Sequence, residues 1–221
     1  GRKVHTGMET GRSVNRLKKE YPDAGCTLDY DHAWQLLVSV RLAAQCTDAR
    51  VNIVVEDLFA RYPSVAALAA AEPEDIEAIV KPCGLGHSKA RDISACMRML
   101  RDKYNCQVPT TFEELLALPG VGRKSANLIM GDVFGKPAIV TDTHCIRLCN
   151  KIGLVDGIKE PQKVEMALWK IIPPEEGSDL CHRFVMHGRA VCNARKPECE
   201  KCCLNDICRY AREQSGADTA Q

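Results

Sequence analysis

The chain has 221 residues, 30 of them basic and 29 acidic, which gives a formal net charge of +1 at pH 7. This length fits one large domain or two modest ones, and a hydrophobic content of 45% is sufficient for a core. The balanced charge neither requires nor excludes binding to nucleic acid. No apolar run is long enough to span a membrane and residues 1–5 lack the apolar core of a secretion signal, so we expect a cytoplasmic protein with no membrane partner.

The apolar residues recur with a helical period almost throughout, and no segment shows a convincing strand alternation. Thr47, Ser88, Thr111 and Asp142 stand where helix caps are expected, and Thr111 with Glu114 forms a capping-box pattern. The tail after residue 213 is polar and is expected to fray. The predicted helices cover residues 13–21, 32–44, 48–60, 65–71, 73–80, 89–103, 112–118, 124–133, 143–152, 160–171 and 177–188. The sequence therefore predicts an all-α protein.

The stretch LPGVGRKSA, residues 118–126, predicts a hairpin between two of these helices. Pro119 and Gly120 end the first helix, and Gly122 ends the turn. Two glycines so close together let the backbone approach another surface. The second helix starts here with free N–H groups and a positive dipole end, which suit a phosphate. The alternative is an ordinary helical hairpin with an exposed lysine at Lys124.

The 13 cysteines are unevenly placed, with five of them in residues 192–208 and the others scattered singly. Four of the five follow the spacing C-x6-C-x2-C-x5-C, namely Cys192, Cys199, Cys202 and Cys208. Four sulfur ligands suit either zinc or an iron–sulfur cluster, although most structural zinc sites use two C-x2–4-C pairs and this loop has one. We interpret Cys203 as a non-ligand and the scattered cysteines as reduced, mostly buried thiols.

Basic residues surround the cysteine-rich loop. They are Arg183, Arg189, Arg195, Lys196, Lys201 and Arg209. Arg195 and Lys196 lie inside the first cysteine interval, where a rigid loop presenting two cations would hold a phosphate well. The alternative is a solvated, charged loop.

Asp142 lies in the segment Val-Thr-Asp-Thr-His, residues 140–144. A structural interpretation makes it the N-cap of the helix that follows. A functional interpretation has its carboxylate face a sugar, where it would stabilise positive charge and help to move protons.

The hairpin, the Asp142 segment and the cysteine spacing occur in this order and resemble the endonuclease III family of helix–hairpin–helix DNA glycosylases. The resemblance extends over about residues 17–209. The family carries its catalytic lysine at the position of Lys124 and its catalytic aspartate in a Val-Asp-Thr-His motif, which this chain matches at Asp142 and departs from at Thr141. The cysteine spacing is similar to the family's [4Fe–4S] loop, which favours a cluster over zinc.

The resemblance implies two helical domains. Residues 26–135 would form a six-helix domain with the hairpin, and residues 1–25 with 136–221 would form a helical domain with the [4Fe–4S] loop. Double-stranded DNA carrying damaged bases or abasic sites would lie across the cleft between them, bound to a monomer.

Two loops would open the duplex. Gln45 resembles the family's glutamine that fills the hole left by a flipped nucleotide, and Leu85 resembles its wedging leucine. The family often has a larger residue and an amide after that leucine, whereas this chain has Gly86 and His87. The expected DNA contacts are Gln45, Leu85, Gly120, Gly122, Arg123, His144, Arg195 and Lys196.

The resemblance implies a bifunctional DNA glycosylase and AP lyase of base excision repair that removes oxidised pyrimidines such as thymine glycol. Lys124 would be the nucleophile and form a Schiff base that leads to β-elimination, with Asp142 as acid/base and electrostatic partner. The alternatives are a monofunctional glycosylase of the same superfamily, which usually lacks this lysine, and a non-catalytic iron–sulfur protein that binds DNA.

Overall fold

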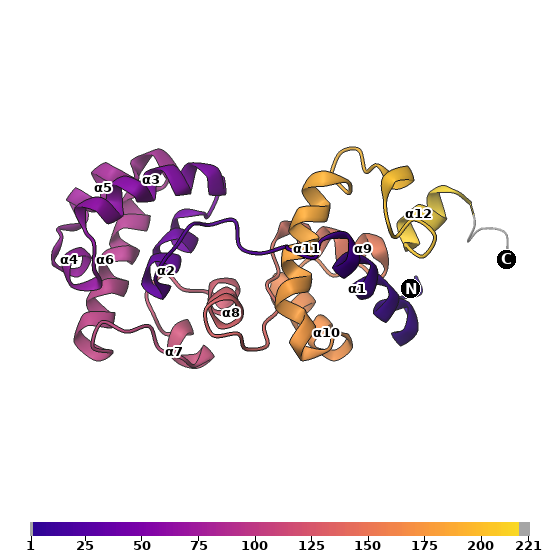
Figure 1. The fold of residues 1–221 in the computed structure, drawn as a ribbon, viewed down its shortest axis with the longest axis horizontal. Helices are drawn as coiled ribbons and strands as arrows, with labels where there is room; N and C mark the ends of the chain where they lie inside the picture. The colour runs from indigo at the N-terminus through magenta and orange to yellow at the C-terminus, as the bar shows by residue number, and fades with distance from the viewer. Residues whose placement is uncertain (1, 217–221) are drawn as a thin grey trace. The chain divides into compact units, whose positions relative to one another are not determined.

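The computed structural model describes residues 2–216, and every regular element in this part of the chain is a helix (Figure 1). The prediction of an all-α fold is therefore confirmed. The chain divides into two compact units. One unit is Cys26–Gly135, and the other combines Gly1–Gly25 with Lys136–Gln221.

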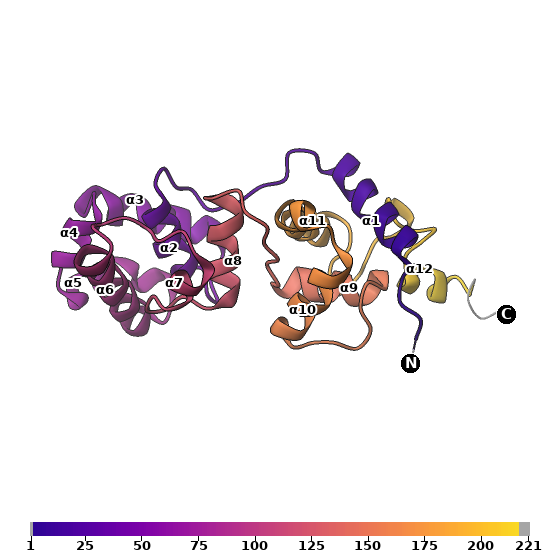
Figure 2. The ribbon, with the colours of Figure 1, turned by 90° about the horizontal axis from the view of Figure 1, so that it is seen from below.

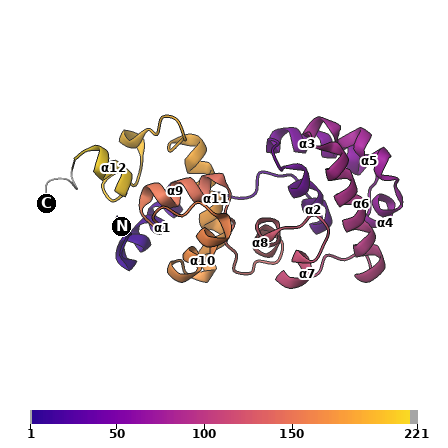
Figure 3. The ribbon, with the colours of Figure 1, turned by 180° about the vertical axis from the view of Figure 1, so that it is seen from behind.

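The Cys26–Gly135 unit is built around one long helix, α6, against which α4 and α5 pack closely (Figures 1 and 3). Its α-helices are α2 (Ala33–Leu42), α3 (Asp48–Arg61), α4 (Val65–Ala70), α5 (Pro73–Val80), α6 (Gly86–Lys103), α7 (Phe112–Leu116) and α8 (Arg123–Asp132), with a 3₁₀ turn at Lys81–Cys83. Helix α2 contacts α3, α6 and α8. Its side chains Leu36 and Leu42 are fully buried, as are Met97 and Leu100 of α6, so these two helices supply the centre of the core.

The second unit joins the two ends of the chain. Its α-helices are α1 (Gly7–Glu20), α9 (Thr143–Ile152), α10 (Pro161–Ile171), α11 (Gly177–Ala190) and α12 (Arg209–Gln214), with 3₁₀ turns at Pro174–Glu176 and Cys199–Lys201. Helix α1 packs against α11 although more than 150 residues separate them (Figures 1 and 2). Leu17, Leu148, Leu168 and Phe184 are fully buried, so α1 is part of the core and not an added arm.

The structure differs from the prediction by a few residues at several helix ends, and by more at α1, α6 and α12. Helix α1 starts at Gly7, and not near residue 13, because Thr6 and Glu9 form a complete capping box. Helix α6 starts at Gly86, before the expected cap at Ser88, with Leu85 as its N-cap residue. Helix α12 follows the cysteine-rich loop and was not predicted. The predicted fraying of the tail falls mostly on residues 217–221, which lie outside the described residues.

No helix among residues 2–216 is long and apolar enough to cross a membrane.

Candidate functional site

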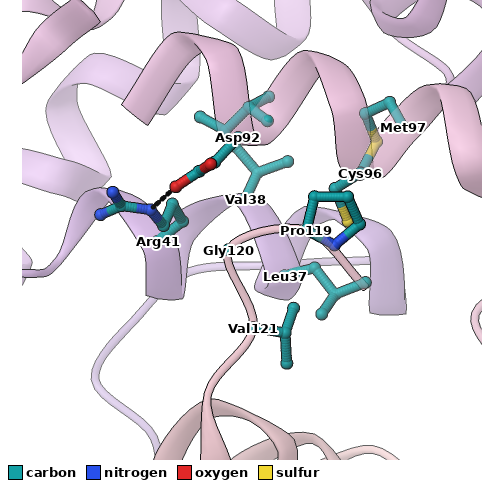
Figure 4. Close-up of a pocket in the computed structure, with 10 residues that line it drawn as sticks. Leu37, Val38, Arg41, Asp92, Cys96, Met97, Pro119, Gly120 and Val121 are labelled. Atoms are coloured by element: carbon teal, nitrogen blue, oxygen red, sulfur yellow. Dashed lines mark hydrogen bonds and ion pairs between the residues drawn. The ribbon is translucent and has the colours of Figure 1, made fainter. Parts of the chain in front are cut away.

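The tip of the α7–α8 hairpin packs against α2 and α6 of its own unit (Figure 4). Gly120 has φ +77°, and a Cβ added to it would lie 2.8 Å from the Cβ of Asp92 on α6. The Asp92 carboxylate is held in turn by Arg41 of α2, with 2.7 Å between Arg41 Nε and Asp92 Oδ2. The position of the hairpin therefore depends on a contact that only glycine can make.

Lys124 is the second residue of α8, and its side chain is exposed. Gly122 is the N-cap and has an extended backbone conformation, and a Cβ added to it would meet no atom within 4 Å. The guanidinium of Arg123 lies over the ring of Phe112, 4.9 Å from its centroid, and links the start of α8 to the start of α7. The hairpin thus presents a surface amine beside the free N–H groups of a helix start.

Asp142 is the N-cap of α9, as the structural interpretation predicted, because its Oδ1 accepts a hydrogen bond of 2.8 Å from the Cys145 N–H. The side chain is half-buried. The cap uses Oδ1 and holds the carboxylate in one orientation, while Oδ2 remains for another partner. The helix cap and the catalytic interpretation are therefore compatible.

His144 is the second residue of the same helix and is half-buried, with its Nδ1 3.0 Å from Nη2 of Arg147. Burial and the nearby guanidinium groups of Arg147 and Arg189 lower the pKa of His144, against the opposing effect of Asp142. Arg147 also donates to the carbonyl of Cys192 at 2.9 Å, so it connects the start of α9 to the cysteine-rich loop. Sequence reasoning missed this arginine, whose partners are distant in the chain.

Gln45 and Leu85 are both exposed, and both have left-handed backbone conformations, with φ of +55° and +51°. Non-glycine residues rarely adopt such φ values, and the surrounding structure must hold them there. Leu85 is 57% exposed, which is high for a leucine. Of the residues that follow it, Gly86 lies close to the Lys81 backbone and His87 pairs with Glu77 at 3.3 Å.

The four predicted ligand cysteines line one cavity of about 280 Å³, counting the space at its mouth. Its other walls are mainly apolar, and Cys203 does not line it. The lining residues are Lys151, Val191, Cys192, Pro197, Glu198, Cys199, Cys202, Cys208, Tyr210 and Ala211. Within residues 2–216, no three His, Cys, Asp or Glu side chains converge in the way that one metal ion requires. The four thiols surround a space and do not meet at a point.

Burial raises the pKa of Cys208 to about 11, and a hydrogen bond with Cys203 together with burial raises that of Cys202 to about 12. A raised pKa means that the thiolate form is disfavoured, and a bound metal group would offset that effect because it stabilises the thiolate. Cys202 also contacts Nε2 of the buried His187 at 3.2 Å, and Nδ1 of His187 lies 2.6 Å from the Tyr21 hydroxyl. These contacts restrict the orientation of the Cys202 side chain, which lines the cavity.

The basic residues near this loop divide into two groups. Arg195 and Lys196 are exposed, and the backbone N–H of Lys196 is held by Asn193 at 2.7 Å. Arg183 and Arg209 are buried and bond to backbone carbonyls, of which Tyr21 O and Asn150 O are examples, so they stabilise the fold and cannot bind phosphate. The surface charge of this region is therefore smaller than the sequence suggested.

The model of the HhH-GPD superfamily of base excision DNA repair proteins matches residues 38–174. The chain is 44% identical over 197 residues to endonuclease III of Synechocystis sp., covering 89% of this chain and 90% of that protein. It is 38% identical to endonuclease III of Escherichia coli, covering 89% of this chain and 93% of that protein. A solved structure of a trapped endonuclease III–DNA covalent intermediate superimposes with a TM-score of 0.90 at 39% identity, covering 96% of this chain and 100% of that one.

An all-α fold with a helix–hairpin–helix and a superfamily match over more than half of its length defines a base excision DNA repair protein. At this identity and coverage, the chain belongs to the endonuclease III family. It is accordingly an enzyme, a DNA glycosylase with AP lyase activity.

Proposed function

We propose that this enzyme removes oxidised or ring-saturated pyrimidines from duplex DNA and cleaves the abasic strand, with Lys124 as nucleophile and Asp142 as its acid/base and electrostatic partner. The observation that carries the proposal is the exposed Lys124 amine at the start of α8, on a hairpin fixed by the close packing of Gly120. The capped and oriented carboxylate of Asp142 supports it.

The chemistry assigns one task to each group. The neutral Lys124 amine attacks the sugar C1′ as the bond to the base breaks, and the base leaves with the electron pair of that bond. The attached amine then loses a proton, and the C1′–O4′ bond breaks as O4′ is protonated, which leaves a protonated Schiff base to the opened sugar. The Schiff base acidifies the adjacent C–H, and removal of that proton expels the 3′ phosphate by β-elimination. The carboxylate of Asp142 stabilises the positive charge that develops on the sugar and exchanges protons with it. Both groups must therefore reach the same flipped nucleotide.

The proposed DNA contacts have different physical roles. The backbone of the hairpin at Gly120 and Gly122, with Arg123 beside it, would hold a phosphate at the start of α8. Arg195 and Lys196 would hold another, since both are exposed. Gln45 and Leu85 would enter the duplex, and His144, kept neutral by its surroundings, would line the lesion pocket. We expect the enzyme to act as a monomer in the compartment that holds the DNA.

We further propose that Cys192, Cys199, Cys202 and Cys208 hold a [4Fe–4S] cluster. The four thiols line a common, mainly apolar cavity, and Cys203 is outside it. One zinc ion would need all four sulfurs at about 2.3 Å from a single point. A cluster binds each sulfur through a different iron and suits thiols that surround a larger space. When bound, such a group would fix the loop that carries Arg195 and Lys196.

The test is borohydride trapping on duplex DNA that contains either an abasic site or thymine glycol. Wild-type protein is expected to give a covalent adduct with both, since borohydride reduces the Schiff base. Lys124→Gln is expected to lose both adducts and to retain DNA binding. Lys159→Gln, which removes another exposed lysine, is the matched control and is expected to trap normally.

Persistent trapping by Lys124→Gln would refute the role of Lys124. An adduct of the wild type with the abasic site alone would keep the lyase and refute the lesion class. No adduct with either DNA would point to a monofunctional glycosylase.

A further inference from the structure

Lys89 of α6 is completely buried, with 0% of its surface exposed. Its ammonium donates three hydrogen bonds to backbone carbonyls, at 2.9 Å to Leu42, 2.8 Å to Ala44 and 2.9 Å to Cys83. A buried lysine without such partners would be strongly destabilising. All three donors of the ammonium are therefore used.

The carbonyls belong to two loops that are distant in sequence. Leu42 is the last residue of α2, and Ala44 immediately precedes Gln45. Cys83 ends the 3₁₀ turn two residues before Leu85. One ammonium thus connects the segment that leads to Gln45 with the segment that leads to Leu85. The backbone N–H of Lys89 also donates to the Leu85 carbonyl at 3.0 Å.

The charge of Lys89 faces carbonyl dipoles and has no carboxylate partner among the described residues. Leu42 and Ala44 lie at the C-terminal end of α2, where the helix dipole favours a cation. Burial lowers the pKa of Lys89, while the nearby thiols of Cys46 and Cys83 oppose that effect and Arg41 adds to it.

Both Gln45 and Leu85 have left-handed backbone conformations. Such conformations cost free energy and persist only where the surrounding structure imposes them. The three bonds of Lys89 hold Ala44, which directly precedes Gln45, and Cys83, two residues before Leu85, and therefore supply that constraint at both places.

We propose that Lys89 is a positioning residue that holds the Gln45 and Leu85 loops in one fixed arrangement, so that both enter the duplex together. This inference rests on the proposed function, in which these two residues open the DNA. Lys89 itself is buried and does not touch DNA. Its effect passes through the backbone of the two loops.

The test is Lys89→Met, which removes the charge and all three donors and keeps an unbranched side chain. The readout is the ratio of base excision from duplex DNA to Schiff-base trapping on a single-stranded abasic oligonucleotide, where no duplex has to be opened. We expect this ratio to fall roughly 10- to 100-fold, the loss typical of a displaced positioning contact. Lys103→Met, an exposed lysine at the other end of α6, is the matched control and is expected to keep the wild-type ratio.

A double-mutant cycle tells whether Lys89 acts on base excision through the position of Gln45 or through a general loss of activity. Gln45→Ala, Lys89→Met and the double variant are compared in duplex excision, and we expect the double variant to be little worse than the worse single one. Additive losses would overturn the proposal, as would a folded Lys89→Met with the wild-type ratio. Faster hydrogen exchange confined to residues 42–47 and 83–87 would support it, and faster exchange throughout the unit would count against it.

If Lys89→Met does not fold, Lys89→Arg replaces it, since the planar guanidinium keeps the charge but cannot direct three donors at convergent carbonyls. A wild-type ratio in this variant would then overturn the proposal. Absence of trapping by the wild-type protein itself would instead refute the proposed function. The two failures are therefore distinguishable.

Discussion

Gly120→Ala is expected to destabilise the Cys26–Gly135 unit strongly. Its backbone has φ +77°, a conformation that costs an alanine about 1–2 kcal/mol. The added Cβ would lie 2.8 Å from Asp92 Cβ, and overpacking of this kind costs about 1–3 kcal/mol. The carboxylate cannot move freely to relieve the contact, because Arg41 holds it at 2.7 Å. The two effects together give a loss of about 2–5 kcal/mol in the free energy of unfolding.

Urea denaturation followed by circular dichroism measures this loss, and Gly122→Ala is the matched control. Gly122 has φ −95°, and its added Cβ would meet nothing within 4 Å, so the variant is expected to lose only the N-cap preference, about 0.5–1 kcal/mol. It is expected to weaken DNA binding, since the methyl group would stand on the proposed phosphate-binding surface. Equal stabilities of Gly120→Ala and the wild type would refute the packing argument shown in Figure 4.

Three further outcomes are expected. Asp142→Asn can keep the cap to Cys145 and therefore the fold, but its single-turnover rate of base removal is expected to fall roughly 100-fold or more; a near-normal rate would contradict its role. Cys199→Ser is expected to lose the visible absorbance and the iron content, which metal analysis measures, whereas Cys203→Ser is expected to keep the absorbance and the iron. Loss of iron from Cys203→Ser as well as from Cys199→Ser would mean that the ligand set is wrong. The pKa of His144 is lowered in the folded state, so the neutral form contributes stability that is complete above the unfolded pKa of about 6.5 and is lost as the pH falls through the lower folded pKa. Thermal unfolding between pH 5 and 8 measures this loss of stability. A pH profile of stability in His144→Gln that equals the wild-type profile would exclude the contribution of His144.

The helices and the caps could be predicted from sequence because both depend on neighbours in the chain. Thr111 does cap α7, accepting from the Glu114 N–H, and Asp142 does cap α9. The first turns of α1 were missed although Thr6 and Glu9 form a capping box, since the exposed glycines that follow gave no apolar period. The start of α6 was missed for another reason, because Leu85 is a left-handed N-cap that no propensity rule favours.

The supporting contacts of the site could not be predicted, since they depend on tertiary structure. A lysine in a polar helix pattern is ordinarily exposed, and nothing in the sequence marks Lys89 as buried. Gly120 was singled out as a residue for close approach to DNA, and the structure shows that it already makes a close approach to Asp92. Arg209 was counted among the basic residues around the cysteine-rich loop, and the structure shows that it is buried. In each case the contact depends on residues that are distant in the chain, and the sequence does not show which residues those are.

Four of the proposed functional residues lie at the start of a helix or just before it. Lys124 is the second residue of α8, Asp142 caps α9, Leu85 is the N-cap residue of α6, and Gln45 lies two residues before the Thr47 cap of α3. Helix starts present free N–H groups and positive dipole ends, which attract the phosphates of DNA within a short range. A chain with a net charge of only +1 has no large field to attract DNA from a distance. Its affinity for DNA must therefore come from local groups, which are the helix starts and exposed cations such as Arg195 and Lys196. A loop at a helix start can also carry a strained residue that the helix behind it holds in place.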